Sequence, residues 1–168
     1  MRFAGIALVA VAAAVAGCGS KKTAPAPVAN PRGTIEGIFQ APLPASATNA
    51  QAVSEQLMTL VFYGRFDCSE KDLAIFLKES KLLPDNLSAG LNPLASVEPS
   101  APWWAPKALS NVSGVECSWE TGEDAANCLL AAGRTGNGNA IVYFMVVYES
   151  KRQTRLRSEV KADPNWPN

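Results

Sequence analysis

The stretch Ala140–Tyr148 constrains the fold more than any other part of the chain. It reads AIVYFMVVY, which is rich in the β-branched and aromatic residues that favour strands. It is also apolar at both odd and even positions, whereas a strand with one face in water alternates apolar and polar residues. The stretch therefore predicts a strand that is covered on both faces and lies at the centre of a sheet.

Two more strands are predicted earlier in the sequence, at Val115–Trp119 and Asn127–Ala132. The segments between the three strands, TGED at 121–124 and RTGNGN at 134–139, have compositions typical of turns. Together these patterns predict a meander of three antiparallel strands. A fourth strand, at an edge of the sheet, is expected at 34–40.

Residues 50–64 and 69–83 predict two helices. In the first, apolar residues recur at helical spacing and Gly64 follows as a stop signal. These apolar residues are Val53, Leu57, Leu60 and Val61. The second helix begins at Ser69, with Asp72 three positions later as a short form of the capping box. Its buried stripe is expected to be Leu73, Phe76 and Leu77.

The expected fold class is therefore α+β, with an N-terminal helical hairpin packed on a three-stranded, or four-stranded, antiparallel β-meander. The helical hairpin covers one face of the central strand. A long Pro/Trp loop at 84–113 is the candidate for covering the other face. Its prolines interrupt regular structure, while its leucines and tryptophans argue against plain disorder.

The most distinctive segment of this loop is PWWAP, which contains Trp103 and Trp104. Two interpretations stay open. In one, adjacent tryptophans braced by prolines form a rigid platform that binds sugar rings or a partner protein. In the other, the indole rings seal the exposed face of the sheet, because they supply large buried areas.

The chain contains no histidine, which is the commonest general base and metal ligand. We therefore predict no catalytic residue, no metal site and no cofactor. The alternative is an enzyme or enzyme inhibitor that uses the carboxylates of Asp67, Glu70 and Asp72. These acidic residues are explained more simply by their position at the start of a helix, where the helix dipole favours negative charge. Acidic and basic residues balance at 15 each, so nucleic acid is not an expected partner.

Three of the chain's 4 cysteines lie in the predicted domain, at Cys68, Cys117 and Cys128. If the predicted hairpin pairs Ser118 with Asn127, Cys117 faces Cys128 directly, within reach of a disulfide. This pair is the favoured bond, with a bond from Cys68 to either one as the alternative. The remaining cysteine is expected to be a buried apolar residue.

The N-terminus has the zones of a secretory signal: basic Arg2, then an apolar run from Phe3 to Ala16, then small residues. The run is shorter than the ~20 residues that a membrane-spanning helix needs. It ends in Val15-Ala16-Gly17-Cys18, which resembles the lipobox of bacterial lipoproteins, with valine where leucine is usual. The resemblance implies cleavage before Cys18 and acylation of this cysteine, which anchors the protein to a membrane.

The resemblance also implies a place in the cell envelope. Gly19 and Ser20 follow the lipobox without an aspartate, which implies transfer to the outer membrane, facing the periplasm. The expected organisation is a signal peptide at 1–17, a lipidated cysteine with a flexible tether at 18–32, and the α+β domain at 33–150. A basic, then Pro/Asn-rich tail follows at 151–168. The expected function is a non-enzymatic module that binds an envelope protein or polymer, in an unknown oligomeric state.

Overall fold

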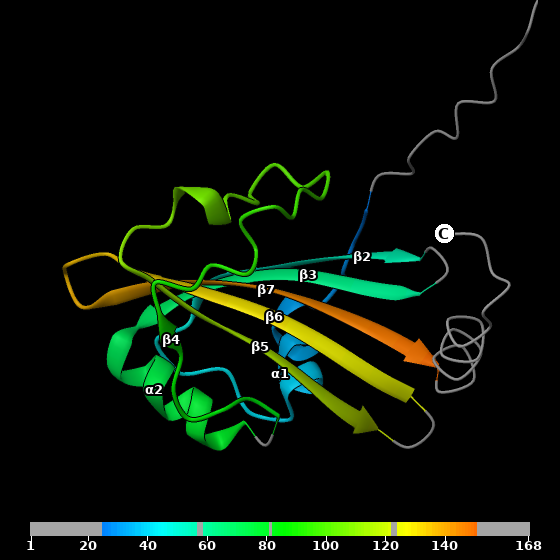
Figure 1. The fold of residues 1–168 in the computed structure, drawn as a ribbon, viewed down its shortest axis with the longest axis horizontal. Coiled ribbons are helices and arrows are strands. Elements are labelled where there is room, and N and C mark those ends of the chain that lie inside the picture. The colour runs from blue at the N-terminus through cyan, green and yellow to red at the C-terminus, as the bar shows by residue number, and fades with distance from the viewer. Residues whose placement is uncertain (1–24, 57–58, 81, 122–123, 151–168) are drawn as a thin grey trace, which may run out of the picture.

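The computed structural model describes residues 25–56, 59–80, 82–121 and 124–150. Its strands all belong to one antiparallel sheet of 7 strands in the order β1-β2-β3-β7-β6-β5-β4 (Figure 1). The strands are β1 (Ala26–Pro27), β2 (Thr48–Gln56), β3 (Leu60–Ser69), β4 (Ser88–Ala89), β5 (Val112–Thr121), β6 (Asp124–Arg134) and β7 (Asn139–Ser150). The helices are α1 (Pro31–Phe39), α2 (Glu70–Glu79) and the short 3-10 helix η1 (Pro106–Ala108).

The prediction of a central strand is confirmed by β7, which lies between β3 and β6. Its side chains alternate between two buried layers. Val142, Phe144 and Val146 pack on the side of the helices, and Tyr143 and Met145 pack on the side of the loop. We call these the inner and the outer face of the sheet.

The predicted helical hairpin on a three- or four-stranded meander is wrong, because the sheet has 7 strands, and residues 50–56 lie in β2 and residues 60–64 in β3 rather than in a helix. Ala50 and Phe62 from this region pack on the inner face, and Val53, Val61 and Tyr63 pack on the outer face, as the alternation of strand side chains requires. Gly64, expected as a helix stop, lies inside β3, where an added Cβ would come within 2.1 Å of the Phe144 ring. This glycine is required by the close approach of that ring.

The predicted edge strand at 34–40 is also wrong, because the helix α1 occupies this position. Its start is fixed by Asn30, whose side chain accepts a hydrogen bond from the Gly33 N–H at 3.1 Å, and by a proline at the first helical position. Gln40 ends the helix in the left-handed conformation. Ala26–Pro27 pairs with β2, so ordered structure begins before the expected boundary at residue 33.

The second predicted helix is confirmed as α2, with Ser69 as its cap and Leu73, Phe76 and Leu77 buried. The Asp72 N–H donates to the Ser69 hydroxyl at 3.1 Å. The helix ends at Glu79, earlier than expected. α1 and α2 both lie on the inner face of the sheet (Figure 1).

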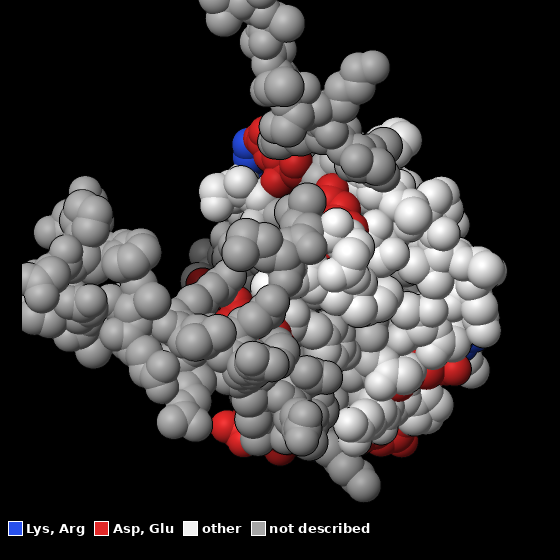
Figure 2. Space-filling view, turned by 90° about the vertical axis from the view of Figure 1, so that its right-hand side faces the viewer, with Lys and Arg blue, Asp and Glu red and all other residues white. Residues whose placement is uncertain are grey.

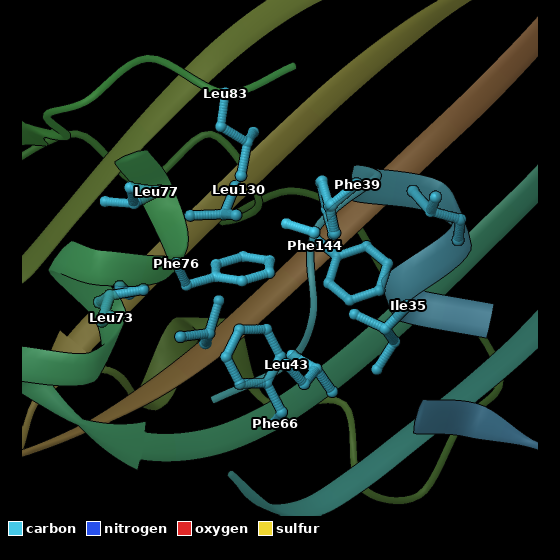
Figure 3. Packing of buried hydrophobic residues seen from close by; sticks show 14 of the residues in the cluster. Ile35, Phe39, Leu43, Phe66, Leu73, Phe76, Leu77, Leu83, Leu130 and Phe144 are labelled. Carbon is cyan, nitrogen blue, oxygen red and sulfur yellow. The ribbon is translucent and has the colours of Figure 1, made fainter. Parts of the chain in front are cut away.

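The inner core is built around four fully buried phenylalanines (Figure 3). The ring of Phe39 from α1 lies 5.0 Å from that of Phe144 and 5.7 Å from that of Phe76, centroid to centroid. Phe66 from β3 lies 5.5 Å from Phe76. All three pairs are edge-to-face, the arrangement that the ring quadrupoles favour. This cluster joins both helices to the middle of the sheet.

The outer face is covered by the irregular segment between β4 and β5, as predicted for the Pro/Trp loop (Figure 1). Leu94 from this segment is fully buried against Ala131 and Tyr143. Within the described ranges, no helix is both long and apolar enough to cross a bilayer.

Candidate functional site

The two tryptophans of the loop lie on the outer face of the sheet. The Trp104 ring is 5.5 Å from the rings of both Tyr63 and Tyr143 and nearly perpendicular to them. Its indole N–H donates to the carbonyl of Val97 at 2.9 Å. Ring contacts on one side and a backbone hydrogen bond on the other fix the position of Trp104 within the loop.

Trp103 is held more loosely. Its ring contacts that of Trp104 at 5.9 Å, and its carbonyl accepts a hydrogen bond from the Tyr143 hydroxyl at 3.3 Å. Both tryptophans are half-buried rather than buried. They therefore cover the outer face, as one of the two interpretations predicts, and part of each indole ring stays exposed.

A cavity of about 210 Å³ opens within the loop beside Trp104. Its lining is Val97, Glu98, Pro99, Trp104, Ala105, Pro106 and Lys107. Lys107 and Glu98 form an exposed ion pair, and the hydrogen bond from Lys107, followed by its charge, lowers the pKa of Glu98. The cavity thus combines one indole and two proline rings with a charged pair, so it can take up a ring that is apolar on its face and polar at its edge.

A larger and more polar cavity, of about 440 Å³, lies where β3 meets the start of α2. Its carboxylate, Asp67, is already engaged. It accepts hydrogen bonds from Asn49 at 2.7 Å and from Arg65 at 3.2 Å. The Arg65 guanidinium also lies 5.5 Å from the centre of the Tyr143 ring. Asp67 therefore positions Arg65 over the outer face of the sheet.

The three carboxylates of the enzymatic alternative do not converge. Asp67 lines the polar cavity, Glu70 lines a second cavity and pairs with Arg134 at 3.5 Å, and Asp72 lines a third. Hydrogen bonds from Ser46 and then Ser69 lower the pKa of Asp72. A pair of catalytic carboxyls must share one site, and these three residues line separate cavities.

Cys117 and Cys128 face each other across β5 and β6, and Ser118 pairs with Asn127, the register on which the disulfide prediction depends. Both are free thiols in the structure, joined by a hydrogen bond. That bond lowers the pKa of Cys117, and together with burial it raises the pKa of Cys128 well above its ordinary value. The disulfide itself stays a prediction.

The third cysteine, Cys68, is a buried member of the inner core. Burial, followed by the charges of Asp72 and Asp67, raises its pKa to about 12. A thiol with so high a pKa is a poor nucleophile at neutral pH. Cys68 therefore acts as a small apolar residue.

Sequence reasoning singled out the two tryptophans but missed the residues that complete their surroundings. Tyr63 was assigned to a helix, so its contact with Trp104 could not be foreseen. Glu98 stands beside Pro99, shortly before the PWWAP segment, and Lys107 directly follows that segment, and this closeness in sequence was the available signal.

Other predicted features cannot be placed. Cys18, the signal peptide and the tail at 151–168 lie outside the described residues. Within the described ranges, no group of three or more cysteine, aspartate or glutamate side chains is arranged to hold a metal ion. In comparisons with models of protein families, with curated proteins and with solved structures, nothing matches this chain.

Proposed function

We propose that this chain is a lipid-anchored, non-enzymatic binding protein of the bacterial cell envelope. The observation that carries the binding role is the cavity beside Trp104, on the outer face of the sheet. The anchoring role rests on the segment VAGC at 15–18 and on its resemblance to a lipobox.

Binding is favoured over catalysis by the chemistry of the side chains. The chain has no histidine, and Asp67, Glu70 and Asp72 each line a different cavity. The Trp104 cavity holds one carboxylate, Glu98, whose pKa is lowered, so it is a poor general acid. What remains is a rigid aromatic surface with a charged edge, which suits recognition.

The ligand class follows from the lining. Trp104 offers an aromatic wall, and Pro99 and Pro106 offer flat apolar rings. Glu98 and Lys107 supply an acceptor and a donor of hydrogen bonds. A sugar ring of an envelope polymer, or a ring side chain of an envelope protein, satisfies both sets of groups. The cavity is small, so one ring at a time can enter.

The anchor is tested by replacing one residue. Cys18→Ser is expected to abolish incorporation of labelled palmitate and to leave the protein as an unprocessed precursor. The parent chain is expected to be labelled and cleaved. Label that persists in the Cys18→Ser chain would contradict lipidation at this position.

The binding surface is tested with a matched pair of variants of the full-length, lipidated protein. Ala105 is exposed and lines the cavity, whereas Ala108 is exposed on the same loop but does not line it. In pull-downs from detergent-solubilised envelopes, Ala105→Arg is expected to lose the components that the parent retains, and Ala108→Arg to keep them. Equal retention by both variants would contradict the cavity as the binding site.

A further inference from the structure

Cys117 and Cys128 are two thiols that share one row of the sheet. Cys117 of β5 lies opposite Cys128 of β6, which in turn lies opposite Val146 of β7. The Gly90 N–H donates to the carbonyl of Val112 at 2.8 Å, so the backbone groups of Val112 point to β4 and those of Cys117 point to β6. The Cα atoms of such a hydrogen-bonded pair are about 5.5 Å apart. A disulfide can bridge this distance without movement of the backbone.

The two sulfurs differ in exposure because their strands differ in position. β6 lies between β5 and β7, and Cys128 is fully buried in the inner core. β5 has a strand partner on its other side only at Ser113 and Gly114, and beyond these residues no other strand of the described chain pairs with that side. Cys117 is half-buried and packs at the margin of the core. A reagent in solution therefore reaches Cys117 before Cys128.

The hydrogen bond between the two thiols reinforces this difference. It lowers the pKa of Cys117, and, followed by burial, it raises the pKa of Cys128 well above its ordinary value. The thiolate is the nucleophile in exchange with a disulfide. Exposure and protonation therefore agree that Cys117 is the residue that attacks, and that Cys128 is held in reserve beside it.

The charges near Cys117 indicate which kind of disulfide it meets. Glu116 precedes Cys117 in the chain, and its side chain is exposed. Figure 2, which shows the side of the molecule where β5 and β7 end, displays several acidic side chains and few basic ones among the described residues. Negative charge attracts cations and repels anions over about 8 Å at physiological salt. A disulfide flanked by basic groups is therefore favoured.

We propose that Cys117 and Cys128 form a thiol–disulfide exchange site for a disulfide that carries positive charge. The Cys117 thiolate attacks one sulfur of that disulfide, forms a mixed disulfide and releases the other sulfur as a thiolate. The sulfur of Cys128 loses its proton and attacks the Cys117 sulfur, which releases the second half of the substrate. Two electrons pass from the pair to the substrate, and the two protons that the cysteines lose pass through solvent to the released thiolates. This proposal is independent of the binding role of the Trp104 cavity.

Exchange is measured on the full-length, reduced protein with cystamine, a small cationic disulfide, as the probe. Digestion after Glu120 separates Cys117 from Cys128, so mass spectrometry can assign each product. Cys117 is expected to react roughly tenfold or more faster than buried Cys68, and the final product is expected to be a bond between Cys117 and Cys128. A Cys117 that does not react in the folded chain, or that reacts no faster than Cys68, would overturn the proposal.

Single replacements separate the roles of the two cysteines. In Cys128→Ala, the mixed disulfide is expected to accumulate on Cys117, because no second thiol displaces the probe. It should form more slowly than in the parent chain, because the hydrogen bond that lowers the pKa of Cys117 is lost. In Cys117→Ala, Cys128 is expected to stay unmodified, and Cys68→Ala is the control that should react like the parent. Modification of Cys128 in Cys117→Ala at the parent's rate would contradict these roles.

Two probes of opposite charge test the class of substrate. Relative to their rates with free cysteine, cystamine is expected to react with Cys117 roughly threefold or more faster than oxidised glutathione, which is anionic. High salt and Glu116→Gln should each reduce this preference. Glu79→Gln, at an exposed position on α2, is the matched control and should leave it unchanged. Equal relative rates with the two probes, or a faster reaction with oxidised glutathione, would overturn the preference for a cationic disulfide.

Discussion

The two faces of the sheet are covered in different ways. The inner face is covered by α1 and α2, whose apolar stripes meet β3 and β7 in a cluster of fully buried phenylalanines. The outer face is covered by an irregular segment that is held by hydrogen bonds to backbone carbonyls. Trp104 donates to Val97, Asn92 donates to Pro106 at 3.0 Å, and Tyr143 donates to Trp103.

This difference has a physical cause. A helix satisfies its own backbone groups, so its side chains are free to supply apolar contact alone. An irregular segment leaves backbone groups without regular partners, and polar side chains must satisfy them. The contact between this segment and the sheet therefore uses Trp104 of the segment and Tyr143 of β7, which each combine a large ring with a polar atom, and the segment keeps a cavity and half-exposed rings. We infer that the inner face mainly stabilises the fold and that the outer face carries the function.

The largest effect is expected from the inner face. Phe144→Ala removes the ring that contacts Phe39 and covers Gly64, and should lower the free energy of unfolding by about 4 kcal/mol. Urea denaturation measures this change. Ile75→Ala, at a side chain that is 43% exposed on α2, is the control and should lower it by less than about 1 kcal/mol. Similar losses of unfolding free energy in the two variants would contradict the stabilising role of the inner face.

The next effect concerns the predicted disulfide on the inner face, between β5 and β6. A disulfide between Cys117 and Cys128 would close a short loop and should raise the free energy of unfolding by about 3 kcal/mol relative to the dithiol. Denaturation with and without reductant measures the difference, and alkylation followed by mass spectrometry identifies the bonded residues. If both thiols are alkylated in protein that was purified from the envelope without reductant, the predicted bond does not form there.

A smaller effect is expected from the indole N–H of Trp104, which holds the segment on the outer face. Trp104→Phe keeps an aromatic ring near Tyr63 and Tyr143 but loses the hydrogen bond to Val97, at a cost of about 1 kcal/mol. Trp104→Ala should cost more, because it also removes the ring. Denaturation of both variants compares the two contributions. If Trp104→Phe costs nothing, the hydrogen bond does not hold the loop.

The last effect is a dependence on alkaline pH, to which groups on both faces of the sheet contribute. Burial raises the pKa of Cys68 on the inner face from 9.0 to about 12, and burial followed by Glu55 raises that of Tyr63 on the outer face from 10.0 to about 12. Each folded-state pKa exceeds its ordinary value, so the folded chain keeps protons that the unfolded chain has lost. Stability is therefore full below about pH 9 and falls as the pH rises toward 12.

Replacing each group separates the two contributions. In denaturation at several pH values, Cys68→Ala should reduce the decline that begins near pH 9, to which Cys128 also contributes, and Tyr63→Phe should reduce the decline that begins near pH 10, to which Tyr148 also contributes. Unfolding free energies that are equal at about pH 8 and pH 11 would contradict both shifts.

The sequence was informative where a pattern has only one solution. The stretch Ala140–Tyr148 is apolar at both odd and even positions, so a strand with this sequence is stable only where both of its faces are covered. It forms the centre of the sheet. The turn composition at 121–124 suggested the hairpin register, and in β5 and β6 Cys117 does lie opposite Cys128. Ser69 and Asp72 marked the start of α2 because capping is a local interaction.

The sequence was misleading where pairing is long-range. The spacing of Val53 and Val61 suits a helix, but their strands β2 and β3 pair with each other, and β3 also pairs with β7, far along the chain. No local pattern reports that Phe144 will rest on Gly64. The Trp104 cavity was missed for the same reason, since its position depends on Tyr63 and Tyr143 from two strands that are distant in sequence.

Photo-crosslinking in intact cells tests most directly whether the outer face carries the function. A benzoylphenylalanine in place of Ala105, beside the Trp104 cavity, is compared with one in place of Ile75, on the exposed side of α2 over the inner face. The account predicts a specific envelope adduct from position 105 and none from position 75. An adduct from position 75 alone, or the same adduct from both positions, would contradict it.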